Sequence, residues 1–204
     1  MIERNFGILA SIDWNSNKWH DKPTSEDLDK SNYGYVIEHG LTFTSLNFGQ
    51  EIYPADSKGY YFGLLPQLWS RMPDQEKSRY VDVVFMKSQR WNDKQNYIVG
   101  LYAFPIFCKC KIPSPISSFP YDFEVNVKAL PKDIHLLENY INLTSHPDLK
   151  MFLPTGKELG KQGYNYLTKA NVFKILDAMT NLNPNDFKLK AIKLRLLTSI
   201  ERKK

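Results

Sequence analysis

The sequence has few cysteines and no long apolar run. Only Cys108 and Cys110 are present among 204 residues. Two cysteines one residue apart exclude the disulfide framework of small secreted domains. No segment reaches the roughly 18 consecutive apolar residues that a membrane-spanning helix needs. The opening MIERNFGILASIDW has only a short apolar stretch and no small-residue cleavage site. We therefore expect a cytoplasmic protein with no membrane segment.

Motifs for metal binding and catalysis are also scarce. The histidines are scattered, and the Cys-x-Cys pair lacks a second pair at zinc-finger spacing. GKELGK, at residues 156–161, lacks the spacing and the Lys-Ser/Thr ending of a phosphate loop. The enzymatic alternative is a metal-dependent nuclease using Asp82, Glu124 and Lys128. The sequence favours a binding domain over an enzyme and predicts no cofactor.

The net charge of +5 is unevenly distributed. Residues 185–204 contain seven basic and two acidic residues, so that residues 1–184 carry 20 of each and are neutral. Bulk attraction to a polyanion would come from this basic tail. A nucleic-acid contact on the rest of the chain must therefore be a local patch or pocket.

Apolar β-branched runs predict a sheet. Residues 6–12 form one strand, and the runs 81–86 and 97–104 form a hairpin around a polar loop that contains Trp91. Gly100 interrupts the second run, which indicates that another backbone or a ligand approaches there. IFCKCKI and FEVNVKAL alternate well enough to be further strands of the same sheet.

Helical patterns dominate the last third of the chain. DIHLLENYI and NVFKILDAM have apolar residues at helical spacing. Strands followed by helices indicate an α+β domain with a mainly antiparallel sheet. We assign this domain to residues 1–183, followed at 184–204 by a basic helical tail or connector with an apolar stripe at Leu189, Ile192, Leu196 and Ile200.

A short capped helix is predicted near the N-terminus. Thr24 stands at the cap position, and Asp27 lies three residues later, where its carboxylate can reach back to the cap. No motif in the sequence pairs Glu26 or Asp27 with a catalytic nucleophile or a metal ligand. Solvated surface charge is the ordinary expectation for both.

Aromatic residues occur where no periodic core pattern requires them. Trp14 and Trp19 lie in a polar loop, Phe48 follows Asn47, and Trp91 lies in the hairpin loop. Aromatic faces that stack on a base contribute about 1 to 3 kcal/mol each. Burial at the end of a small barrel is the alternative for each of these residues. The pattern therefore allows either a base-binding site or ordinary packing.

Several segments resemble the EVE and YTH domains of the PUA-like superfamily. The hairpin at 81–104, the segments NFGILASIDW and SLNFGQ, and the stretch from Leu137 to Leu176 resemble successive parts of the EVE pattern. The resemblance implies a small twisted β-barrel or sheet flanked by helices, with one modified base held in an aromatic cage. The long insert between Phe48 and Tyr80 departs from compact family members.

The resemblance also implies a function. Related domains are specificity domains of GTP-dependent restriction enzymes of the McrBC type, where they flip a methylated base out of DNA. We expect base contacts from Trp14, Trp19, Asn47, Phe48, Tyr61, Ser88 and Trp91, and phosphate contacts from Arg71, Lys87 and Arg90. The expected partner is modified DNA, with modified RNA as the alternative. A motor or nuclease domain or subunit could join through the tail. A protein-interaction domain with exposed aromatics is the remaining alternative.

Overall fold

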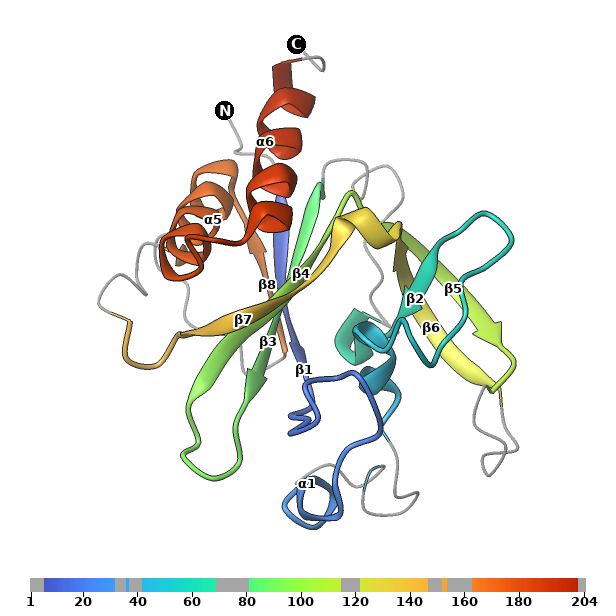
Figure 1. The fold of residues 1–204 in the computed structure, drawn as a ribbon. Helices are drawn as coiled ribbons and strands as arrows, with labels where there is room; N and C mark the ends of the chain where they lie inside the picture. The colour runs from blue at the N-terminus through green and yellow to red at the C-terminus, as the bar shows by residue number, and fades with distance from the viewer. Residues whose placement is uncertain are drawn as a thin grey trace.

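The computed structural model describes residues 6–31, 36, 42–68, 81–114, 122–146, 152–153 and 163–201. The fold is α+β, with two twisted sheets and helices at their ends (Figure 1). Arg71, most of the insert between Phe48 and Tyr80 beyond residue 68, and GKELGK lie outside the described residues.

The larger sheet has five strands in the order β7-β4-β3-β1-β8. Their bounds are Gly7–Ile12 (β1), Val83–Gln89 (β3), Asn96–Ala103 (β4), Ile134–Asn142 (β7) and Tyr164–Leu167 (β8). The β1–β3 pairing is parallel and the other pairings of this sheet are antiparallel. The predicted first strand and the predicted hairpin are confirmed.

The smaller sheet has three strands in the order β2-β6-β5. Their bounds are Tyr61–Gly63 (β2), Ile106–Ile112 (β5) and Phe123–Ala129 (β6), and both pairings are antiparallel. The expectation that β5 and β6 extend the hairpin sheet is wrong. Both edges of β4 are already paired with β3 and β7, and the chain turns at Phe104, which has a φ of 47°. Within the described residues the strands form two sheets, not a closed barrel.

Helices cover one end of the larger sheet. α5 (Lys169–Leu182) and α6 (Phe187–Glu201) lie together there, whereas the short α1 (Ser25–Asp29) lies beyond the opposite end of β1 (Figure 1). The 3-10 helices η1 (Phe43–Asn47), η2 (Pro66–Leu68) and η3 (Pro131–Asp133) complete the described elements. The apolar stripe of α6 packs into the same core as the sheet, through Leu189, Ile192 and Leu196.

The segment DIHLLENYI forms strand β7, and its prediction as a helix is wrong. Its apolar residues at helical spacing also suit an irregular strand, because the pairing of β7 with β4 shifts register between Ile98 and Gly100. Hydrogen bonding to β4 decides between the two structures, and that pairing joins residues far apart in sequence. The helical predictions for α5, α6 and the capped α1 are confirmed.

The larger sheet separates two apolar clusters. Alternate residues of β3 point to opposite faces: Val83 and Phe85 pack with α5 and α6, whereas Val84 and Met86 pack with Trp19 and other residues of the second cluster. This second cluster fills the space between the two sheets and carries most of the aromatic side chains that the sequence analysis singled out.

Gly100 confirms the prediction of a close approach. A Cβ atom at this position would lie 2.4 Å from the carbonyl oxygen of His135 and 2.6 Å from Cζ of Phe48. The absence of a side chain therefore lets β7 and the ring of Phe48 pack directly against β4.

Two buried asparagines bind the main chain of the two residues that follow β2. The Asn47 side chain accepts from the N–H of Leu64 at 2.8 Å and donates to its C=O at 3.0 Å. The Asn126 side chain makes the same pair of bonds to Leu65, both at 2.8 Å. Both asparagines are fully buried. Each satisfies two backbone groups that would otherwise be buried without partners.

We expect Asn126→Leu to destabilise the protein strongly. The substitution leaves the N–H and C=O of Leu65 without their amide partner, at a cost of roughly 1 to 3 kcal/mol per group, or about 2 to 6 kcal/mol in total. Urea denaturation measures this loss in the free energy of unfolding. Asn185→Leu, at an exposed position, is the matched control and should stay within about 0.5 kcal/mol of the wild type. Equal stability of the two variants would contradict the assigned role.

Candidate functional site

A cavity of about 630 Å³ lies between the end of β1, α1 and the loop that joins β3 to β4. Its lining combines aromatic, apolar and charged side chains from these three regions: Ile12, Asp13, Trp14, Pro23, Asp27, Leu28, Lys30, Ser31, Val36, Thr42, Gln89, Arg90, Trp91 and Lys94. Three residues predicted from the sequence as site residues, Trp14, Arg90 and Trp91, therefore meet at one cavity. A larger hollow of about 720 Å³ between β7 and α5 contains none of the predicted residues.

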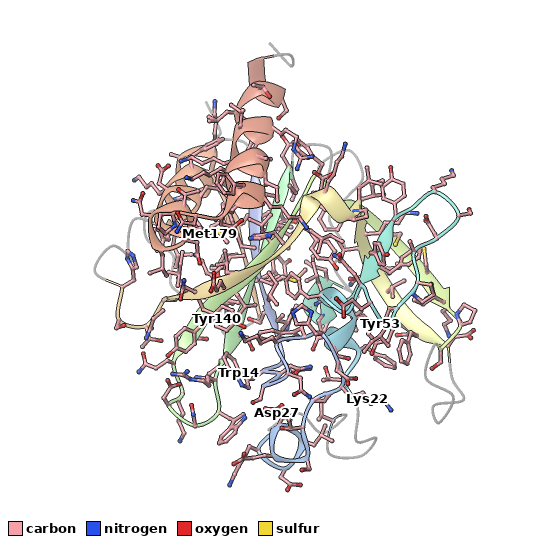
Figure 2. The ribbon with its side chains drawn as sticks, in the orientation of Figure 1. Trp14, Lys22, Asp27, Tyr53, Tyr140 and Met179 are labelled. Atoms are coloured by element: carbon pink, nitrogen blue, oxygen red, sulfur yellow. The ribbon has the colours of Figure 1, made fainter. Side chains whose placement is uncertain are left out.

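Trp14 lies where the cavity meets the aromatic core. Its ring makes an edge-to-face contact with Trp19 at 5.5 Å between centroids, and similar contacts with Tyr97 at 6.0 Å and Tyr140 at 6.2 Å. Trp14 lies between Tyr140 above and Asp27 below (Figure 2). Because Trp14 is half-buried, its contacts with neighbouring rings fix its orientation while part of its surface lines the cavity.

Trp91 approaches the cavity from the hairpin loop. Its indole N–H donates to Oδ1 of Asp27 at 2.9 Å, which joins the loop to α1 across 64 positions of sequence. The Trp14 indole reaches the same carboxylate indirectly: its N–H donates to the Ser16 hydroxyl at 3.2 Å, which donates to Oδ1 of Asp27 at 2.7 Å. Both tryptophans are thus anchored to one acidic group.

Asp27 is a buried structural acceptor. Besides its bonds to Trp91 and the Ser16 hydroxyl, Oδ2 accepts from the main-chain N–H groups of Ser16 at 2.9 Å and Thr24 at 3.0 Å. The bond to Thr24 completes the capping box of α1. Its side chain is buried, so the prediction of a solvated surface charge is wrong. The sequence did show the capping box, but not the two long-range donors.

The hydrogen bonds of Asp27 favour its charged form. Burial by itself would raise the pKa of this carboxyl group, but donors from Ser16, Trp91 and Thr24 together hold the pKa below its ordinary value of 3.8. Asp27 is therefore ionised at neutral pH and accepts from four donors at once.

Asp13 is a second acidic group at the cavity. Its Oδ2 accepts from the Thr42 hydroxyl at 2.5 Å and from the Thr44 hydroxyl at 3.3 Å. Burial raises the pKa of Asp13, and these two hydroxyl donors offset only part of that rise. The group therefore presents a desolvated carboxyl next to Trp14, where a ligand with a hydrogen-bond donor would gain from contact with it.

Basic side chains stand at the rim of the cavity. Lys30 and Lys94 are exposed. Arg90 lies over the Tyr97 ring at 4.7 Å and over the Trp14 ring at 5.8 Å. Its guanidinium also pairs with Asp93, which raises the pKa of Arg90. The cavity thus has acidic groups in its wall and cations around its opening.

The other predicted base-contacting residues lie elsewhere. Trp19 and Phe48 are buried in the core, with exposed fractions of 0% and 4%. Asn47 is occupied by its bonds to Leu64. Tyr61 lies on β2 in the smaller sheet, and Ser88 is buried opposite Tyr97 in the hairpin. None of these five side chains lines the cavity.

Lys87 is placed unfavourably for a phosphate contact. It is only 7% exposed, and burial lowers its pKa. Met86, the residue before it on β3, packs in the aromatic cluster, so Lys87 points to the opposite face of the sheet. Only Arg90 among the described phosphate candidates lies at the cavity.

The residues of the nuclease alternative have separate partners. Lys128 binds Asp56 at 3.0 Å and Glu124 pairs with Lys111 at 3.8 Å, both on β6, whereas Asp82 immediately precedes β3 of the other sheet. In the part of the chain that the structure describes, no three His, Cys, Asp or Glu side chains are grouped as a metal site would require. Over the same ranges, no helix is long and apolar enough to cross a membrane.

Comparison of the chain with protein-family models, curated proteins and solved structures found no match.

We expect Asp27→Asn to loosen the cavity wall. An amide offers one acceptor oxygen where the carboxylate has two, and its NH₂ group would face donors. The expected loss in the free energy of unfolding is about 1 to 3 kcal/mol, with a red shift of tryptophan fluorescence as Trp91 is released. Asp29→Asn, on the exposed side of the same helix, is the control. An unshifted emission maximum in Asp27→Asn would contradict the anchoring role.

The loss of stability in Asp27→Asn depends on pH. Since the folded-state pKa of Asp27 is lowered, its stabilising contribution is complete above the ordinary value of 3.8 and is lost as pH falls through the lower folded value. The stability difference between wild type and Asp27→Asn should therefore be constant near neutral pH and shrink on acidification below 3.8. Urea titrations over this range measure it, and a difference that grows on acidification would contradict the assignment.

Proposed function

We propose that this chain binds a modified base, flipped out of DNA, in the cavity between Trp14 and Trp91. The observation that carries the proposal is that two indoles line one cavity and are both anchored through their N–H groups to the Asp27–Ser16 pair. Anchored rings lose little conformational entropy when a planar ligand stacks on them. A flipped base is such a ligand.

The size of the cavity suits a small planar ligand. Its volume of about 630 Å³ lies within the roughly 300 to 1,000 Å³ common for small-molecule sites. A base that enters must give up its stacking and pairing in the duplex, at a cost of a few kcal/mol. Stacking on Trp14 and Trp91, at about 1 to 3 kcal/mol per aromatic contact, is large enough to offset this cost.

The chemistry of the wall favours a base that carries both a polar edge and an apolar substituent. Asp13 and Thr42 provide hydrogen-bonding groups, whereas Pro23, Leu28 and Val36 provide apolar surface. A methyl group placed against such a surface improves affinity by about 1 to 3 kcal/mol. This is the contribution that would separate a methylated base from an unmodified one.

The rim of the cavity suits the phosphates that flank a flipped nucleotide. Lys30 and Lys94 are exposed there, and Arg90 is held in place by Asp93 and Tyr97. Cations around an opening hold the backbone while the base is read inside. Binding is therefore expected to weaken as salt concentration rises.

The resemblance to EVE and YTH domains supports the same proposal. In that reading the chain adopts a PUA-like fold and serves as the specificity domain of a modification-dependent restriction system, without enzymatic activity of its own. A motor or nuclease domain or subunit would supply cleavage. Modified RNA is the alternative ligand, because a splayed base in a single strand would stack on Trp14 and Trp91 in the same way.

Fluorescence anisotropy with matched duplexes tests the proposal. The duplexes carry no modification, methylated cytosine or methylated adenine. We expect one modified duplex to bind more tightly than the unmodified one, and Trp14→Ala and Trp91→Ala to weaken that binding by about fivefold to more than a hundredfold, the equivalent of one lost stacking contact each.

The control is Phe187→Ala, which removes an exposed aromatic ring on α6 and should leave DNA binding unchanged. Equal binding to all three duplexes, or full binding by both tryptophan variants, would refute recognition of a modified DNA base at this cavity. Single-stranded RNA with the same modifications, tested in parallel, separates the RNA alternative from loss of function.

A further inference from the structure

Helix α6 carries two apolar stripes. One stripe, formed by Leu189, Ile192 and Leu196, is fully buried against the sheet. The other is exposed to solvent and follows the spacing i, i+4, i+7, i+10 along the helix: Phe187, Ala191, Leu194 and Leu197. Phe187 is 81% exposed, Leu194 62% and Leu197 42%. An amphipathic helix needs only one apolar stripe to pack on its domain, so packing on the sheet does not account for the second stripe.

The exposed stripe borders a groove. A hollow of about 540 Å³ lies between the end of α5 and α6, lined by Thr180, Asn181, Pro184, Lys190, Lys193, Leu194 and Leu197. Leu182, at the end of α5, is 46% exposed. Figure 1 shows α6 beside α5, with its last turns extending past α5. Apolar residues at helical spacing beside a groove are typical of surfaces that receive another helix.

The charged residues that line the groove are cations. Lys190 and Lys193 line it directly. Lys193 forms an ion pair with Asp177, with 2.5 Å between Nζ and Oδ1. Lys190 lies over the Phe187 ring at 5.8 Å and has no ion pair within the described ranges. An occupant with carboxylates beside its apolar residues would neutralise these lysines, and one with lysines would be repelled.

We propose that the groove between α5 and α6 binds an acidic amphipathic helix of a partner protein. Apolar side chains of that helix pack on Phe187, Leu194 and Leu197, and its carboxylates face Lys190 and Lys193. This surface is separate from the cavity at Trp14 and Trp91, which lies at the opposite end of the larger sheet.

Two other occupants fit the surface less well. A second copy of this chain would bring Lys190 and Lys193 close to the same lysines of its neighbour in an isologous helix pair, and like charges would oppose each other. A nucleic-acid backbone would pair with the lysines but leave the apolar stripe unsatisfied, because such interfaces are more polar than protein interfaces. Arg195 is also engaged already, with Asp133 at 2.7 Å.

The test uses the full chain and two synthetic helical peptides of about three heptads. Both carry leucine at the spacing i, i+4, i+7, i+11. The remaining positions are mostly glutamate in the acidic peptide and lysine in the basic peptide. We expect the acidic peptide to bind with a Kd below about 100 μM, and the basic peptide to bind at least about tenfold more weakly, as measured by fluorescence anisotropy of labelled peptide.

Variants identify the surface that is used. Leu194→Asp should weaken binding of the acidic peptide by at least about tenfold, and Lys190→Glu combined with Lys193→Glu should reverse the preference in favour of the basic peptide. Ile52→Asp, at a residue 40% exposed elsewhere on the molecule, is the matched control and should change nothing. Thermal melts confirm that each variant is folded.

The proposal is overturned if the acidic peptide does not bind, if both peptides bind equally, or if Leu194→Asp has no effect. It is also overturned in favour of self-association if the chain sediments as a dimer that Leu194→Asp dissociates. Weaker duplex binding by Leu194→Asp, with peptide binding unchanged, would instead assign the surface to nucleic acid.

Discussion

The arrangement of the candidate site depends on the burial of one carboxylate. Asp27 accepts four hydrogen bonds from three separate segments: the loop after β1, the start of α1 and the loop between β3 and β4. Because this carboxylate is buried, each donor that it loses leaves a buried acceptor short of a partner. One side chain therefore sets the positions of Trp91 and Ser16, and through Ser16 that of Trp14.

Local sequence signals predicted the elements that local interactions determine. The capping box of Thr24 and Asp27, the two-stranded hairpin and the stripe of α6 are each readable within about twenty residues. Strand β7 was mistaken for a helix, and β5 and β6 were assigned to the wrong sheet. Both errors concern which strands pair, and pairing is decided by contacts between residues distant in sequence, such as Gly100 with Leu136.

The site was predictable only in part, because local sequence shows which residues are unusual but not which of them meet in space. Trp14 and Trp91 stood out because tryptophan is rare in polar loops, and the structure brings both to one cavity. Trp19 and Phe48 gave the same signal but are buried in the core, since the sequence does not show on which side of the sheet a loop folds back. Asp13 and Asp27 were missed as wall residues because their burial depends on Thr42 and Trp91, which lie 29 and 64 positions away.

The most direct test of the central claim is the effect of a modified duplex on the indole N–H resonances of isotope-labelled protein. If a modified base binds in this cavity, a duplex with the preferred modification shifts the signals of Trp14 and Trp91 while that of the buried Trp19 moves little, and the unmodified duplex leaves all three in place. Shifts that are the same for both duplexes, or that spare Trp14 and Trp91, would contradict base recognition in this cavity.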